Sequence, residues 1–382
     1  MAQLGTMCLV PFKNPPKNGA YSGLAWLIVP LKGVYTIYVP EFLARRHFPE
    51  MDDLESLIES FGAAARSRVV AHVRHKEKVY PLYCLSIGSP DPEAPSMGYF
   101  AGAHGLEKIG AEVVLAYMHT LLELLRWDRQ FQERLKHSRI VFMPIVNPVG
   151  IVNRTRSNGN GVDLIRNSPL EAEESGGGFY RGHRITPKLP YYRGSEGVLE
   201  TEIKALYQVL EEELLPSKVS LAVDVHSGFG AKDRFWFPYA HSRQPFPYLS
   251  EAYAIKELLD QTYPHHFYAF EPMSRQYTIH GDPWDHVFLE HRKTKDHGFF
   301  VPFTLEMGSW NWLKKNPMQL LSKNGVFDPI LPHRRRRILR RHLNLFDFLH
   351  RLILSPKAWL YQSQNVRDEN IRKARELWYD KK

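Results

Sequence analysis

The chain has 382 residues, of which 43% are hydrophobic and 24% are charged, which is ordinary usage for a globular protein with a large core. Its net charge of +9 comes largely from an arginine-rich stretch at 334–341, so the excess describes one segment more than the whole surface. Its two cysteines, Cys8 and Cys84, are too few for a disulfide framework and exclude a cysteine-ligated metal site. No apolar run approaches the roughly 20 residues that span a bilayer.

Residues 1–48 are expected to form an N-terminal appendage. Two short apolar runs at 24–30 and 34–40, split by Lys32-Gly33, predict a β-hairpin there. The hydrophobic periodicity then predicts several elements in order: a helix over 51–65, strands at 68–73, 79–87 and 97–103, a helix over 107–127 and a buried strand at 140–146.

The segment 147–195 differs from its surroundings, because it is rich in Gly, Asn, Ser, Arg and Pro. A loop of this length inside a compact domain is either functional or disordered. Beyond it the pattern predicts helices over 200–214 and 248–262, strands at 219–225 and 300–305, and one amphipathic helix over 333–354. Aromatic-rich loops at 235–239 and 263–270 are of the kind that line a cleft.

Helices alternate with short, almost continuously apolar strands along the whole chain. This pattern is typical of an α/β protein with a mixed, mostly parallel twisted sheet and helices on both faces. We expect this domain to cover residues 49–356 and a partly helical tail to cover 357–382. The N-terminus has no signal-peptide pattern, so we expect a cytoplasmic protein without a membrane partner.

Three of the apolar strands end in polar side chains. His104 and Glu107 follow the strand at 97–103, His226 ends the strand at 219–225, and Glu306 ends the strand at 300–305. Ligands of open α/β sheets bind outside the carboxyl ends of the strands. If the three strands are neighbours, two histidines and two glutamates therefore converge on one crevice.

Such a set suits a catalytic zinc site. Two His and one Glu give three ligands and leave a fourth position open for water, which a catalytic site requires. Zinc lowers the pKa of bound water from 15.7 to about 7, so a second carboxylate such as Glu306 suffices as the base.

Six motifs, taken in order over about residues 80–350, resemble those of the zinc metallocarboxypeptidases of the carboxypeptidase A type. They are the HGLE sequence at 104–107, NPVG at 147–150, RSNGNGVDLIRN at 156–167, DVHSG at 224–228, QYTIHG at 276–281 and FTLE at 303–306. The resemblance implies a metallocarboxypeptidase-like fold and a zinc peptidase with one Zn²⁺ ion.

The resemblance also implies a role for each matching residue of the metal centre. His104, Glu107 and His226 would bind the zinc ion, and Glu306 would be the general base. Asp163 would orient His104 through its second ring nitrogen, as metal-bound histidines commonly require.

The substrate side follows from the same resemblance. Arg156 would stabilise the oxyanion, Tyr277 would close over the substrate, and Arg166 would pair with its terminal carboxylate. Ile165 stands where the family has an asparagine that shares this carboxylate, and isoleucine has no donor. Trp284 falls near the side-chain pocket and argues against a basic terminal residue. We therefore expect hydrolysis of a peptide or amide bond with unusual recognition of the substrate end.

Two other functions compete with this one. A zinc-dependent acyl-amino-acid deacylase of the succinylglutamate desuccinylase/aspartoacylase type shares the HxxE…H core, although the stretch at 156–167 fits the carboxypeptidases better. A non-catalytic protein that binds anions or nucleic acid through the arginines at 334–341 is the second alternative. We do not expect nucleic-acid binding, because solvated basic helix faces are common.

Overall fold

The computed structural model describes residues 27–31, 34–38, 48–174, 178–294, 298–315, 317 and 325–380. The chain divides into two compact units, residues 1–55 and 56–382. In the first unit, β1 (Leu27–Leu31) pairs antiparallel with β2 (Val34–Tyr38). The outer ends of the predicted hairpin runs lie outside the described residues, and the extent of an appendage over 1–48 stays a prediction. Helix α2 (Pro49–Phe61) spans the boundary of the two units.

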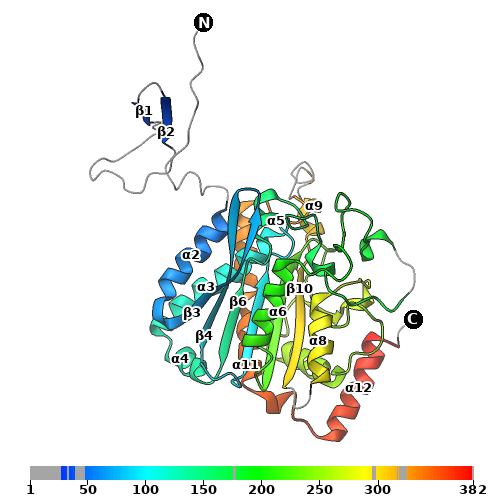
Figure 1. Cartoon of the computed structure of the whole chain (residues 1–382). Helices are drawn as coiled ribbons and strands as arrows, with labels where there is room; N and C mark the ends of the chain where they lie inside the picture. Colours follow the sequence, from blue (N-terminus) through cyan, green and yellow to red (C-terminus); the bar gives the residue numbers. More distant parts are fainter. Residues whose placement is uncertain are drawn as a thin grey trace. The chain divides into compact units, whose positions relative to one another are not determined.

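The second unit is built on one sheet of eight strands in the order β3-β4-β6-β5-β7-β10-β8-β9 (Figure 1). The strands are β3 (Ala65–His75), β4 (Lys78–Gly88), β5 (Ser96–Ala101), β6 (Arg139–Met143), β7 (Val219–Ser227), β8 (Arg234–Phe237), β9 (Ala269–Pro272) and β10 (Phe299–Met307). The four central strands β6, β5, β7 and β10 pair in parallel, as do β8 and β9, whereas the pairs β3/β4, β4/β6 and β10/β8 are antiparallel. The predicted mixed, mostly parallel sheet is thus confirmed.

Helices connect and cover these strands. They are α3 (Lys108–Trp127), α4 (Arg129–Lys136), α5 (Pro148–Asn153), α6 (Thr201–Glu213), α7 (Leu249–Thr262), α8 (Pro283–Lys293), α9 (Trp310–Lys315), α10 (Pro332–Arg341), α11 (Leu343–Ile353) and α12 (Gln364–Trp378). None of the helices in the described ranges is both long enough and apolar enough to cross a membrane.

Both faces of the central strands are buried, as neighbouring residues of β5 show. Tyr99 points to one face, where its hydroxyl donates to the Phe346 carbonyl of α11 at 2.8 Å. Phe100 points to the other face and packs edge-on against Trp284 of α8, with ring centroids 5.0 Å apart. Helices α6 and α8 lie in front of the sheet in Figure 1. This two-sided cover explains why the central strands are apolar at almost every position.

The structure differs from the sequence prediction in the C-terminal helix and on the β8/β9 side of the sheet. The predicted helix over 333–354 is two helices, α10 and α11, separated at His342, whose buried ring meets the Tyr268 hydroxyl at 3.0 Å. The aromatic loops at 235–239 and 263–270 contribute the short strands β8 and β9, and α8 was not predicted. Four-residue strands are too short to show a period, so the sequence pattern could not separate them from loops.

Helix α6 anchors the loop that carries Arg156 and Asp163. The Asn158 side chain donates to Glu200 Oε2 at 2.9 Å and reaches both Glu202 carboxylate oxygens at 3.3 Å. Burial raises the pKa of Glu202 to about 7. A carboxyl group that is buried in this way keeps its proton to a higher pH than an exposed one.

The turn between His104 and Glu107 depends on a glycine. A Cβ atom at Gly105 would lie 1.9 Å from the carbonyl carbon of Gly150 and 2.3 Å from the Ile151 nitrogen. Both are backbone atoms, so no side-chain rotation could relieve the clash. Position 105 therefore has to be glycine for the turn to pack on α5.

We expect Glu202→Gln to flatten the pH dependence of stability. The folded-state pKa of Glu202, about 7, exceeds the ordinary value of 4.5, so wild-type folding is favoured below pH 5 and loses this contribution as the pH rises towards 8. The resulting change in the free energy of unfolding between low and high pH amounts to about 3 kcal/mol at most. Urea unfolding at pH 5 and pH 8 measures it, with exposed Glu211→Gln on the same helix as the control. Parallel curves for wild type and Glu202→Gln would contradict the assignment.

We expect Gly105→Ala to lower the free energy of unfolding by about 3 kcal/mol, because the backbone of α5 has to move. Gly197→Ala is the matched control, since a Cβ there meets nothing within 4 Å although φ is +71°. Denaturant unfolding of both variants checks the prediction. Equal losses would show that the close approach at Gly105 is unimportant.

Candidate active site

The three strands that end in polar residues are neighbours in the order β5-β7-β10. Ala101 of β5 pairs with Val225 of β7, and His226 of β7 pairs with Glu306 of β10. Because these pairs are parallel, all three carboxyl ends reach the same edge of the sheet. The arrangement that the sequence argument required is therefore present.

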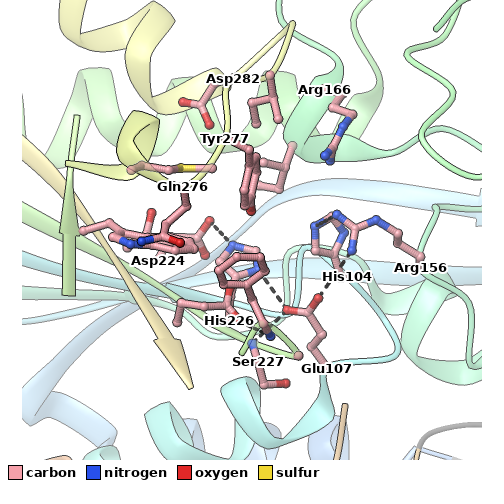
Figure 2. A pocket seen from close by; sticks show the side chains of 18 of the residues that line it. His104, Glu107, Arg156, Arg166, Asp224, His226, Ser227, Gln276, Tyr277 and Asp282 are labelled. Carbon is pink, nitrogen blue, oxygen red and sulfur yellow. Dashed lines mark hydrogen bonds and ion pairs between the residues drawn. The ribbon is translucent and has the colours of Figure 1, made fainter. Parts of the chain in front are cut away.

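The residues after β5 form a tight turn that leads into α3. The Glu107 amide donates to the His104 carbonyl at 3.0 Å, and Glu107 is the N-cap residue of α3. His104 is 3% exposed, Glu107 4% and His226 6%. The turn thus directs the side chains of His104 and Glu107 inward, where they meet His226 from the neighbouring strand (Figure 2).

These three side chains form a group that can hold a metal ion. Each of His104, Glu107 and His226 offers one ligand atom, and these atoms lie within 4.8 Å of one another. Glu107 Oε2 meets His226 Nδ1 at 2.9 Å, and His104 Nδ1 is buried without a hydrogen-bond partner. Two imidazoles and one carboxylate are a donor set that suits zinc with one open position. In the part of the chain that the structure describes, no second such group occurs.

The two rings of this group differ in charge. Burial lowers the pKa of His104 to about 3, and positive Arg156 adds to the effect, so this ring is neutral as a metal ligand must be. Burial also opposes charge on His226, but Asp224 and Glu107 outweigh it and raise the pKa of this ring well above its ordinary value. Metal binding at His226 would therefore release a proton.

Glu306 lies beside this group at the end of β10. Its Oε1 accepts a hydrogen bond from the Phe229 amide at 2.9 Å. Burial raises the pKa of Glu306 to about 8, and the negative charge of Glu107 adds to the rise. A nearby cation would favour the charged form, so the group is suited to exchange a proton near neutral pH.

Asp224 holds His226 from behind, and sequence reasoning did not single it out. Asp224 Oδ2 lies 2.7 Å from His226 Nε2 and accepts from Trp284 Nε1 at 2.8 Å. A carboxylate behind a ligating histidine fixes the ring orientation. The available signal was the spacing, because residues two apart in a strand lie on one face. Trp284 was predicted to line the substrate pocket, and it also lines this site.

Asp163 links two arginines. Its Oδ2 accepts from Arg156 Nε and from Arg166 Nη1, both at 2.9 Å. Its Oδ1 lies 3.8 Å from His104 Nδ1, which is longer than a hydrogen bond. Arg156 Nη2 donates to His104 Nε2 at 2.7 Å, so the arginine lies directly against the metal-ligand group, as Figure 2 shows.

One cavity of about 510 Å³ is lined both by the possible metal ligands and by the residues predicted to bind the substrate. Every predicted site residue except Asp163 lines it: His104, Glu107, His226, Glu306, Arg156, Tyr277, Arg166, Ile165 and Trp284. The Tyr277 ring packs against Phe229 and Trp236, with centroids 5.4 and 6.0 Å away. Burial raises the pKa of Tyr277, so its hydroxyl stays protonated and can donate.

Two aromatic residues of the long loop also line the cavity and were not predicted. Tyr180 contacts Arg166 through its backbone carbonyl, and the Tyr191 ring lies 5.2 Å from the Arg156 guanidinium and 4.8 Å from that of Arg166. A backbone contact leaves no trace in residue types. The general prediction that 147–195 is a functional loop was the only available pointer.

Solved structures with the same fold are related to this chain at low identity. The bovine thrombin-activatable fibrinolysis inhibitor, solved in complex with tick carboxypeptidase inhibitor, superposes with a TM-score of 0.60 at 18% identity, over 81% of this chain and 97% of that chain. Carboxypeptidase A from Helicoverpa armigera gives 0.54 at 16% identity, over 85% of this chain and 72% of that chain. Likeness at this identity shows the fold alone.

The sequence comparisons agree with the motifs. Carboxypeptidase SOL1 from Arabidopsis thaliana is 27% identical over 135 residues, which is 34% of this chain and 27% of the length of that protein. The chain thus matches about a quarter of this curated relative. The profile of the zinc carboxypeptidase family matches residues 77–308, more than half of the 382 residues. This match confirms the resemblance of the six motifs: the chain belongs to the zinc carboxypeptidase family of metallopeptidases.

Proposed function

We propose that this protein is a zinc-dependent hydrolase that cleaves a peptide or amide bond next to a C-terminal residue. The observation that carries the proposal is the position of Glu306 beside the His104, Glu107 and His226 group in one cavity. When bound to these three ligands, one zinc ion would supply a Lewis acid that makes water acidic enough to lose a proton near neutral pH.

In the proposed reaction, Glu306 transfers the proton. Its carboxylate takes the proton of the attacking water and then delivers it to the leaving amine. The hydrogen bond from the Phe229 amide to Oε1, at 2.9 Å, fixes the carboxyl group and leaves Oε2 for this exchange.

Arg156 and Tyr277 act on the substrate. The carbonyl oxygen gains negative charge when water attacks, and the guanidinium of Arg156, held by Asp163 at 2.9 Å, is oriented to stabilise that charge. The protonated Tyr277 hydroxyl donates a hydrogen bond to the bound peptide. Apolar side chains of Ile165, Met273 and Trp284 line the cavity and favour an apolar residue after the scissile bond.

Glu306→Gln should abolish most of the turnover but keep the metal. Glutamine keeps the acceptor oxygen for Phe229 but cannot carry the proton, so kcat should fall about 10³-fold. Hydrolysis of an N-acyl dipeptide and zinc content by mass spectrometry measure both effects. The exposed Glu290→Gln serves as the control with wild-type values. Retained turnover in Glu306→Gln would exclude this residue as the base.

One zinc ion should bind per chain and stabilise the fold. At a free zinc concentration of 100 Kd the gain is about 2.7 kcal/mol, which a shift of the unfolding curve reports without any substrate. His226→Ala should lose the shift, whereas His137→Ala, whose side chain is 71% exposed, should keep it. A shift that survives in His226→Ala would place the metal elsewhere. A chelator should remove activity, and added zinc should restore it.

A further inference from the structure

The guanidinium of Arg166 is already fully engaged by the protein. Its Nε and Nη2 both donate to the Tyr180 carbonyl, at 3.0 and 2.7 Å, and its Nη1 donates to Asp163 Oδ2 at 2.9 Å. The Tyr191 ring covers it at 4.8 Å, and the residue is 4% exposed. The Nε/Nη2 edge, which would bind a carboxylate with two parallel hydrogen bonds, therefore bonds to a backbone oxygen.

The segment that supplies this oxygen, residues 179–193, is called the strap here. It is held in place by buried contacts on both sides. Arg181 Nε donates to the Thr278 carbonyl at 3.1 Å, and the His280 amide donates to the Arg181 carbonyl at 2.9 Å. At its far end Arg193 Nε donates to the Arg166 carbonyl at 3.2 Å. Displacing Tyr180 would break several of these bonds together.

Gly182 lets the strap approach Arg166. A Cβ atom there would lie 3.1 Å from Arg166 Cδ and 3.0 Å from Arg193 Cδ, and φ is +116°, a region that favours glycine. The close approach of the strap to Arg166 thus depends on glycine at position 182.

The described residues that line the cavity include one other arginine, Arg156, and no lysine. Ile165 has no donor, and Arg156 already contacts Asp163 and His104. The cavity is also lined by Asp224 and Asp282, and neither supplies a donor for a carboxylate. Burial and the neighbouring Asp285 raise the pKa of Asp282 well above its ordinary value, and Asp224 is engaged by His226 and Trp284.

We propose that the residue after the scissile bond enters this cavity with a neutral amide end, either a carboxamide or a continuing peptide, and not with a free α-carboxylate. The proposal rests on the hydrolysis proposed above and refines its substrate class. With a carboxamide the cleaved bond still lies next to the last residue, whereas a continuing peptide would make the cleavage internal. The strap supplies the acceptor that Arg166 needs, so the Nε/Nη2 edge is not left for a substrate carboxylate.

Three matched substrates test this proposal with the zinc-loaded full chain. An N-acyl dipeptide ending in phenylalanine is offered as the free acid, as the carboxamide, and extended by one glycinamide. We expect kcat/KM of the carboxamide or of the extended peptide to equal or exceed that of the acid, and the two neutral substrates distinguish a blocked end from a continuing chain. A tenfold or greater preference for the acid over both would overturn the proposal.

Gly182→Ala tests the role of the strap. The added methyl group should push the strap from Arg166 and free its donor edge, which shifts the acid-to-amide ratio of kcat/KM at least tenfold towards the acid. Gly197→Ala, with φ of +71° and no neighbour within 4 Å, should leave the ratio unchanged. Circular dichroism and zinc content confirm that both variants fold. An unchanged ratio in a folded Gly182→Ala variant would refute the role of the strap.

A binding measurement without turnover distinguishes failure of this proposal from failure of the proposed function. Calorimetric titration compares phenylalaninamide with phenylalanine, the two products that differ only at the end group. If no peptide is hydrolysed, the proposed function fails, but tighter binding of phenylalaninamide still supports the neutral end. Tighter binding of phenylalanine, or binding of neither, overturns it.

Discussion

The in-register parallel pairing of β7 with β10 is the constraint on which the rest of the site depends. It places Glu306 directly opposite His226, and the pairing of β5 with β7 brings the His104 turn to the same edge. Backbone hydrogen bonds of three buried strands thus fix Glu306 relative to the group of His104, Glu107 and His226 that can hold a metal ion. Sites on rigid elements hold their geometry more closely than sites on loops. The loops then only have to supply Arg156, Arg166 and Tyr277.

Charge balance is the second condition, because a buried ion requires a partner. Asp163 carries its charge between two arginines, each 2.9 Å from one oxygen. Burial opposes charge on His226, but Asp224 and Glu107 outweigh it and raise the pKa of this ring. Burial also raises the pKa of Glu306 to about 8. A cation between His104, Glu107 and His226 would replace the proton of His226 and favour the charged form of Glu306.

The central strands and the four residues His104, Glu107, His226 and Glu306 could be predicted from the pattern, because continuous apolar runs end there in His or Glu. The other predicted site residues came from the resemblance of the motifs. The spacing of Asp224 and His226 places both on one face of a strand, but the Trp284 donor comes from a helix 60 residues later and leaves no sequence signal. β8 and β9 have four residues each and show no period, and the break at His342 depends on its contact with Tyr268. The bond from Arg166 to a backbone carbonyl leaves no sequence signal. The cytoplasmic location remains a prediction from sequence alone.

The strand order also has a kinetic consequence. The segments that meet at the site come from positions 104, 226 and 306, and β5 reaches β7 only after β6, α5, the long loop and α6 have been made. Contacts between residues so distant in sequence close large loops, and parallel pairings of this kind form slowly. In chain order, His104, Glu107 and His226 are all made before Glu306 of β10. A newly made chain that has reached β7 but not β10 therefore holds the three possible metal ligands without the neighbouring carboxyl group.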